Sequence, residues 1–191
     1  MKVVLASQSP ARLELLHRIG ILNVSVIPAN IDESSLKNEK PKDLAIRLSK
    51  EKALKISSNF GNQELIIAAD TVVCVGTREL PKPRTDLDVR YCLSLLAGRR
   101  HRVYTGVTIV KSGTDQIRTK LAKTIVKIKK LTSVEIEEFI ASKEGLNKAG
   151  GYSIQGFMQC FVPFINGQVS NVIGLPLFET KNMLVSLGYK F

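Results

Sequence analysis

Two serines and an arginine near the start of the chain form a pattern that suits a phosphate. The segment 7–12 reads Ser-Gln-Ser-Pro-Ala-Arg and directly follows an apolar run. Serine before proline favours a helix start, so the segment predicts a turn from a strand into a helix over 10–19. Arg12 in the first turn opposes the helix dipole. Its place makes sense if an anion lies between the free backbone N–H groups, the guanidinium, and the hydroxyls of Ser7 and Ser9. A capped surface helix with a solvated arginine is the alternative.

Asp70 and Thr71 interrupt the most apolar segment of the chain, which runs over 65–69 and resumes at 72–75. That segment predicts a strand buried on both faces. A buried carboxylate needs a cation, a metal or several donors. An aspartate that caps a turn at a strand end is a common alternative, but the apolar run resumes at once. We therefore expect Asp70 to belong to a site, where an apolar setting would also suit a base.

Three further charged residues are candidates for the same site. Lys52 lies on the inward stripe of a helix predicted over 41–56, where a lysine either extends to solvent or reaches a buried anion. The pair Asp32 and Glu33 could supply oxygens to a hard cation such as Mg²⁺, although such pairs in loops are usually solvated. Lys82 lies between two prolines. A rigid turn there could position it for a phosphate, or simply be exposed.

A glycine-rich loop over 150–156 is the fourth candidate segment. Glycines let a backbone approach a ligand closely, yet the loop matches neither common phosphate-loop motif. Gln155 carries both a donor and an acceptor, which suits reading the edge of a base. A purely structural role for Gln155 is equally compatible with the sequence.

The elements that must position these residues alternate between strand and helix. Apolar periodicity predicts the strands. Turn residues indicate where helices end, and two capping boxes, at 85–88 and 132–135, indicate where helices begin. With no repeat or linker, we expect one α/β unit over 1–191 with a mixed, twisted sheet and flanking helices. The predicted strands are 3–6, 24–27, 65–75, 101–110 and 117–128, and the predicted helices are 10–19, 41–56, 85–96, one from 133 and one after Pro176.

Composition narrows the class of protein. The 191 residues are 44% apolar and 24% charged, as in ordinary globular proteins, and no apolar run approaches the ~20 residues of a membrane span. The N-terminal apolar run is too short for a secretory signal. Cys74, Cys92 and Cys160 are widely spaced and resemble small core residues, which favours a reducing cytoplasm. We expect a cytoplasmic protein that does not enter a membrane.

The net charge of +11 has three interpretations. A positive field could bind nucleic acid or draw a small polyphosphate into a cleft, or the surface could simply be basic. The basic residues are dispersed, and no aromatic ladder runs among them as a single-strand platform would need. Nucleic acid is therefore the less favoured partner.

Taken together, these segments resemble the Maf family of nucleoside triphosphate pyrophosphatases. Each matching block is short, but the blocks follow the order and spacing of the family nearly from end to end. They are residues 5–12, 14–16, 32–33, 52–53, 69–73, 82–83, 148–156 and 170–177.

The resemblance implies hydrolysis of a nucleoside triphosphate between its α and β phosphates, which gives a monophosphate and pyrophosphate with a divalent cation, Mg²⁺ or Mn²⁺. It also implies an elongated, two-lobed α/β fold around a central cleft, in a family where homodimers are common. The form of the loop around Gln155, together with Arg12, is similar to the branch that acts on dTTP and UTP. Modified pyrimidine nucleotides are further candidates.

The resemblance also implies a role for each residue. The residue matching Asp70 is the proton acceptor, and it holds the metal together with the one matching Glu33. Those matching Ser7, Arg12, Lys52 and Lys82 face the phosphates, and Ser9 joins them from its place in the same turn. Those matching Arg12, Thr71 and Gln155 are associated with the choice of base.

The chain departs from the family pattern at four positions. Ala11 replaces an arginine, Pro81 a glycine and Asn147 an aspartate, while Met158 stands where a smaller residue is common. We expect Met158 to crowd the loop near the ligand. Such changes leave an alternative open, a non-enzymatic nucleotide or nucleic-acid binder that has lost efficient turnover.

Overall fold

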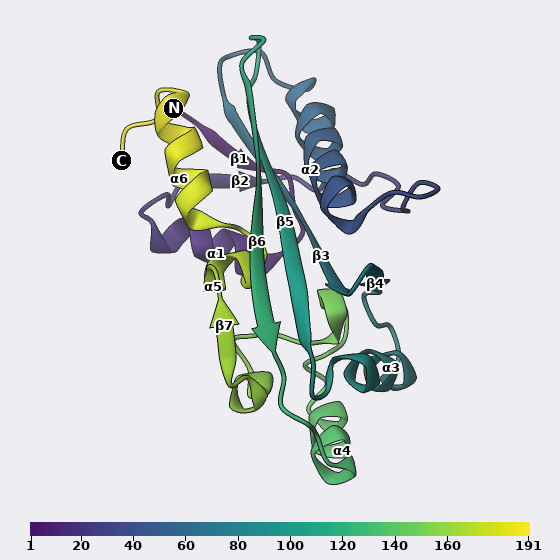
Figure 1. Cartoon of the computed structure of the whole chain (residues 1–191). Helices are drawn as coiled ribbons and strands as arrows, with labels where there is room; N and C mark the ends of the chain where they lie inside the picture. Colours follow the sequence, from purple (N-terminus) through teal and green to yellow (C-terminus); the bar gives the residue numbers. More distant parts are fainter.

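One twisted, mixed sheet of seven strands runs through the molecule (Figure 1). The computed structural model describes residues 1–191. The strand order is β2-β1-β3-β5-β6-β7, and β4 pairs separately with β3. β1 is parallel to its two neighbours, while the remaining pairs are antiparallel. The strands are β1 (Val3–Leu5), β2 (Val24–Val26), β3 (Leu65–Val75), β4 (Arg78–Leu80), β5 (Arg100–Lys111), β6 (Ile117–Lys127) and β7 (Phe164–Asn166).

Six α-helices and two short 3₁₀ turns flank the sheet. α2 packs on one face against β3 and β5, and α6 packs against β5 on the other. The capping boxes predicted for α3 and α4 are both present. No helix combines the length and hydropathy that a bilayer crossing requires. The helical elements are α1 (Pro10–Arg18), α2 (Pro41–Ser57), α3 (Asp86–Leu96), α4 (Ser133–Ala141), η1 (Ala149–Gly151), η2 (Phe157–Phe161), α5 (Val169–Ile173) and α6 (Leu177–Ser186).

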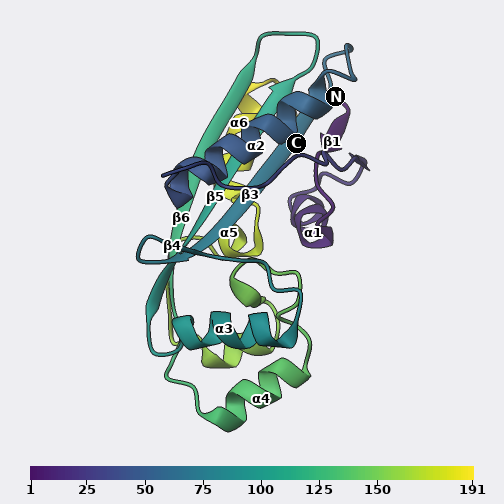
Figure 2. The same ribbon diagram turned by 90° about the vertical axis from the view of Figure 1, so that its right-hand side faces the viewer.

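The molecule is elongated, with hydrophobic clusters at both ends (Figure 2). At one end, α1, α2 and α6 cover the two faces of the sheet; we call this the α2 lobe. At the other, α3 and α4 pack with η2; we call this the α3–α4 lobe. The strands β3, β5 and β6 extend along the molecule and connect the lobes (Figure 2).

The structure confirms the α/β class, the mixed sheet and every predicted strand and helix. It adds the short elements β4, β7, η1, η2 and α5, whose three to five residues give too little periodicity to predict. Cys160 is exposed, so its expected place in the core is wrong. Cys74 and Cys92 are buried as predicted.

One edge of β3 has a gap in its pairing, and Asp70 and Thr71 lie in that gap. β1 pairs with β3 only as far as Ile67, while β4 begins on the same edge at Val73. On the opposite edge, β5 pairs continuously past this region. Because side chains alternate along a strand, Asp70 faces α2 and Thr71 faces the other side. The gap leaves both residues next to open space.

A glycine directly opposite Asp70 lets α2 approach the sheet. Gly106 on β5 is the register partner of Asp70. A Cβ added at Gly106 would lie 2.2 Å from the backbone oxygen of Ala45 on α2. The helix that carries Lys52 therefore depends on the missing side chain for its close packing.

Gly106→Ala should lower the free energy of unfolding by about 1–3 kcal/mol, because the added methyl overpacks the contact between α2 and β5. Urea unfolding measures the change. Gly61→Ala is the matched control, since a Cβ there meets nothing within 4 Å. Equal stability of the two variants would contradict the packing argument.

A histidine and a tyrosine form a buried polar contact between β5 and the glycine-rich loop. Nε2 of His101 lies 2.6 Å from the hydroxyl of Tyr152. The side chains are 1% and 5% exposed, and Nδ1 of His101 has no partner. Burial lowers the pKa of His101 to about 4 and raises the pKa of Tyr152. His101 is therefore neutral in the folded protein at pH 7.

His101 should make the protein less stable as the pH falls from about 6.5 to about 4, since only the unfolded chain takes up a proton there. The slope approaches about 1.4 kcal/mol per pH unit. Urea unfolding at pH 7 and pH 4.5 should show a smaller loss for His101→Gln than for the unmodified protein. His17→Gln, at an exposed position, should keep the full loss. An unchanged pH dependence in His101→Gln would refute the assignment.

Candidate active site

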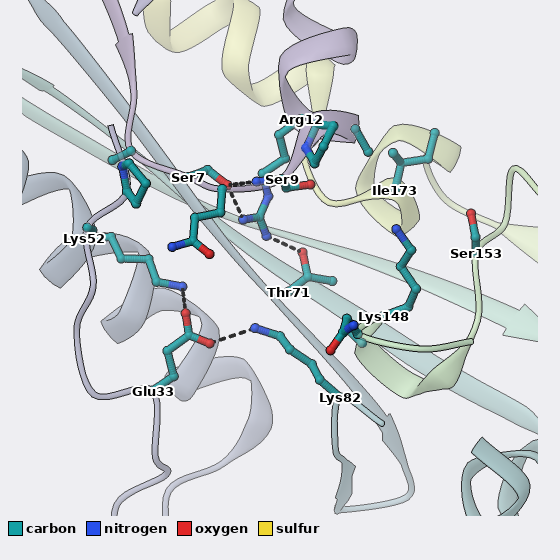
Figure 3. A pocket seen from close by; sticks show the side chains of 18 of the residues that line it. Ser7, Ser9, Arg12, Glu33, Lys52, Thr71, Lys82, Lys148, Ser153 and Ile173 are labelled. Carbon is teal, nitrogen blue, oxygen red and sulfur yellow. Dashed lines mark hydrogen bonds and ion pairs between the residues drawn. The ribbon is translucent and has the colours of Figure 1, made fainter. Parts of the chain in front are cut away.

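A cleft of about 570 Å³ lies where the two lobes meet. Its walls come from the turn between β1 and α1, the loop after β2, Lys52 of α2, Thr71 in the gap of β3, the glycine-rich loop and α5 (Figure 3). It contains seven predicted substrate-binding residues and one predicted metal ligand, Glu33. The predicted residues in its lining are Ser7, Ser9, Arg12, Glu33, Lys52, Thr71, Lys82 and Gln155.

Four charged side chains form a continuous chain of ion pairs at one end of the cleft. Nζ of Lys82 lies 2.7 Å from Oε2 of Glu33. Oε1 of Glu33 lies 2.6 Å from Nζ of Lys52, which in turn lies 2.5 Å from Oδ1 of Asp70. Figure 3 shows the two lysines approaching Glu33 from opposite sides. The sequence left open whether Lys52 extends to solvent or reaches an anion. In the structure its ammonium group contacts two anions, Glu33 and Asp70.

Burial makes this chain of charges strongly interdependent. Lys52 is 7% exposed and Asp70 is 3% exposed. Removing Lys52 would leave the buried Asp70 without a paired cation, whereas removing Asp70 would leave Lys52 with Glu33 as its single anionic partner. Partial desolvation of Glu33 favours its neutral form, but hydrogen bonds from Lys52 and Lys82 outweigh it and hold its pKa at about 2. Glu33 is therefore an anion throughout the neutral range.

Asp70 opens into a smaller cavity of about 250 Å³ rather than into the main cleft. Glu33, Thr71 and Lys82 line both spaces, so the two adjoin. Oδ1 of Asp70 accepts the bond from Lys52, while Oδ2 has no hydrogen bond to the protein. One carboxylate oxygen thus remains available to a water or a metal.

Arg12 is held at the opposite side of the cleft by three hydrogen bonds. Nε donates to the carbonyl of Gly174 at 2.7 Å, and Nη1 donates to Oγ of Ser7 at 3.0 Å. Nη2 donates to Oγ1 of Thr71 at 3.3 Å. Desolvation lowers the pKa of Arg12, and the charges of Asp70 and Glu33 partly offset this. The guanidinium is fixed in place before any anion arrives.

Ser9 precedes the first residue of α1, as predicted, but its side chain makes no capping bond. Instead, Oγ of Ser7 accepts from the backbone N–H of Ser9 at 3.1 Å. The hydroxyl of Ser9 is thereby left without a role in the helix, while its residue lines the cleft.

The glycine-rich loop forms the wall of the cleft on the α3–α4 lobe. Gly150 and Gly151 have φ values of 71° and 77°, a backbone region that favours glycine. Tyr152 and Ile154 supply apolar surface, and the side chain of Gln155 is exposed with no hydrogen bond. Gln155 is therefore free to contact a ligand.

Three details of the sequence interpretation change. Met158 does not crowd the cleft, because its side chain is fully buried in the core of the α3–α4 lobe. Asp32 lines neither cavity and instead accepts a hydrogen bond from the N–H of Ser34. Lys148 lines the cleft and has no acidic partner (Figure 3). The sequence analysis gave it no role beyond its place in the matched block 148–156.

Glu33 and Asp70 are the two carboxylates that could hold a divalent cation beside the cleft. Nowhere do three acidic, histidine or cysteine side chains cluster as a metal site. Glu33 and Asp70 nevertheless meet around one ammonium group, that of Lys52. Mg²⁺ in proteins is commonly held by one or two carboxylates, with phosphates and waters completing its shell. Two carboxylates beside an open cleft meet that requirement.

Comparison with known proteins finds relatives that match nearly the whole chain. The Maf-like protein family matches residues 2–187. A nucleoside triphosphate pyrophosphatase of Orientia tsutsugamushi (strain Boryong) is 56% identical over 192 residues, which is 99% of this chain and 93% of the relative. One from Rickettsia felis is 52% identical and covers 100% of this chain and 95% of its own. Among solved structures, a HAM1 protein from Coxiella burnetii overlaps 67% of this chain and 73% of its own, with 17% identity and a TM-score of 0.43.

The family match spans nearly the whole sequence, and the two relatives are more than half identical to it over almost their full lengths. The chain therefore belongs to the Maf-like protein family.

Proposed function

We propose that this protein is a nucleoside triphosphate pyrophosphatase that acts on dTTP and UTP. The observation that carries the proposal is the chain of ion pairs from Lys82 through Glu33 and Lys52 to Asp70, which ends on a carboxylate oxygen without a protein partner. The names of the relatives from Orientia and Rickettsia support the reaction class.

The cations of the cleft bind and orient the triphosphate. Lys52 and Lys82 share the charge of Glu33, so an arriving phosphate can take one ammonium donor without leaving Glu33 unpaired. Arg12 is already oriented by the Gly174 carbonyl and so needs little reorganisation. These groups offset the negative charge that develops on the phosphates during attack.

Asp70 accepts the proton from the attacking water. The water oxygen forms a bond to the α phosphorus, the bond from that phosphorus to the bridging oxygen breaks, and pyrophosphate leaves with the bonding electrons. The proton passes to Oδ2 of Asp70, the oxygen that Lys52 does not occupy. Because Lys52 holds Oδ1, the carboxylate is fixed in orientation while it acts as a base.

Glu33 and Asp70 would hold a divalent cation, Mg²⁺ or Mn²⁺. When bound, such an ion neutralises phosphate charge and polarises the phosphoryl oxygens. The residues of the chain then keep the phosphates and the water in place.

The pyrimidine lies against the glycine-rich loop in this proposal. Gln155 on this loop offers a donor and an acceptor for the edge of the base, and the partly exposed Val172 and Ile173 of α5 give apolar lining for its faces. Uracil and thymine present both kinds of group on that edge. Of the four departures from the family pattern, Met158 is buried outside the cleft, whereas Ala11 and Asn147 line it.

Asp70→Asn should lower kcat for pyrophosphate release from UTP by at least about 100-fold, since an amide cannot accept the proton. Pyrophosphate and orthophosphate are measured separately. Asp115→Asn, in an exposed turn, should keep full activity. Circular dichroism should show that both variants fold. Turnover within about threefold of the unmodified protein in Asp70→Asn would rule out the base.

Removal of divalent cations with a chelator should abolish turnover, and added Mg²⁺ should restore it. Glu33→Gln should raise the Mg²⁺ concentration for half-maximal activity by about tenfold, the size expected for one charged group. Glu14→Gln, which breaks only an exposed pair with Arg18, is the control. Full activity in the chelator would contradict the metal assignment, and an unchanged Mg²⁺ dependence in Glu33→Gln would contradict the role of Glu33.

A further inference from the structure

Two threonine hydroxyls connect Arg12 at the cleft to a backbone carbonyl in the interior. Nη2 of Arg12 donates to Oγ1 of Thr71 at 3.3 Å. Oγ1 of Thr71 lies 3.0 Å from Oγ1 of Thr105, and Thr105 donates to the carbonyl of Asn171 at 2.9 Å. The three residues beyond Arg12 are far apart in sequence. Thr71 lies on β3, Thr105 on β5 and Asn171 on α5.

The chemistry of a hydroxyl group fixes the direction of every proton in this series. A threonine has one O–H donor, and Thr105 uses its own on the carbonyl of Asn171. The bond between the two threonines must therefore be donated by Thr71. Thr71 already accepts from Arg12 and has no further proton to give. Toward a ligand in the cleft, the hydroxyl of Thr71 can therefore accept a hydrogen bond but not donate one.

The interior end of the series is rigid, so the direction does not easily reverse. Thr105 and Asn171 are both fully buried. Nδ2 of Asn171 donates to the carbonyl of Val103 at 3.1 Å and to Oγ1 of Thr124 at 2.9 Å. The carbonyl that takes the proton of Thr105 is thus held by its own residue's contacts to β5 and β6.

Thr71 and Asp70 lie on opposite faces of β3, which separates Thr71 from the buried lysine on α2. Asp70 meets Lys52 on the α2 face. Thr71 lies on the face of α5, where Val172 and Ile173 add apolar lining to the cleft. A base, rather than a phosphate, is the part of a nucleotide that such lining suits.

We propose that Thr105 is a positioning residue that selects the base by fixing the proton of Thr71. The proposal deepens, and rests on, the proposed pyrophosphatase activity toward dTTP and UTP. An acceptor-only hydroxyl favours N3–H of uracil or thymine. Cytosine has a lone pair at N3, which would face the lone pair of Thr71 without a proton between them. Thr105 itself touches no substrate.

The test compares Thr105→Val with Thr105→Ser, using kcat/KM for UTP and for CTP. Valine keeps the shape but frees the proton of Thr71, which can then serve the N3 lone pair of cytosine. The ratio of UTP to CTP activity should fall about tenfold, the size of one hydrogen bond. Serine keeps the hydroxyl and should restore the ratio of the unmodified protein.

A matched control on the same strand separates this effect from damage to the fold. Thr108 is equally buried and bonds to Ser49 and Thr119, on the other face of the sheet. Thr108→Val should leave the ratio unchanged, whatever its cost in stability. A ratio that does not change in Thr105→Val, or that serine fails to restore, would overturn the proposal.

The failure of the underlying function has a different signature. If the unmodified protein releases no pyrophosphate from any pyrimidine triphosphate, the proposed function fails and this inference with it. If the protein releases pyrophosphate and only the Thr105→Val ratio stays constant, the function stands and the role of Thr105 is refuted.

Discussion

The site depends on one buried ammonium group that two carboxylates share. Lys52 is almost inaccessible to water and contacts both Glu33 and Asp70. A buried charge of this kind persists only where its partners are held close, so the surrounding fold must supply the fit. Gly106 lets α2 approach β3 closely enough for the contact. The gap between β1 and β4 along β3 leaves Asp70 open to the smaller cavity on the side away from β5.

The same interaction links the resting site to its proposed reaction. With two lysines and two carboxylates, the group carries no net charge and is stable without a ligand. A triphosphate brings several negative charges, which compete with Glu33 and Asp70 for the lysines. Glu33 has two lysine partners and can give up one contact. The ion pairs therefore keep two ammonium groups beside the cleft with their charges balanced by carboxylates. A bound triphosphate can replace a carboxylate as the partner of an ammonium group.

Three charged residues of the site could be identified from the sequence because each is unusual for its position. Asp70 breaks an apolar strand, Lys52 lies on an inward helix face, and Arg12 opposes a helix dipole. The larger strands and helices were predictable from periodicity and capping residues. The burial of Met158 and the turn made by Asp32 were not, since neither follows from local spacing. The family match supports the reaction class, and the roles of the individual residues stay predictions.

The remaining half of the site is built from ordinary residues that only tertiary structure brings together. Thr105 lies within a β-branched strand where threonine is common, and nothing in the matched block 170–177 marks the carbonyl of Gly174 as a partner of Arg12. α5 is five residues long, too short for a periodic pattern, yet it supplies the acceptor for Thr105. Hydrogen bonds across more than 60 residues of sequence fix these groups. Position along the chain therefore could not reveal them.

The most direct test is a crystal structure of the unmodified protein with Mg²⁺ and the α,β-imido analogue of UTP, which cannot be cleaved between those phosphates. The account predicts that Nζ of Lys52 or Lys82 lies about 3 Å from a phosphate oxygen, with at least one contact to Glu33 lost. It also predicts that Oδ2 of Asp70 faces the α phosphate. Phosphates bound elsewhere, with all three contacts among Lys52, Lys82 and their carboxylates intact, would contradict it.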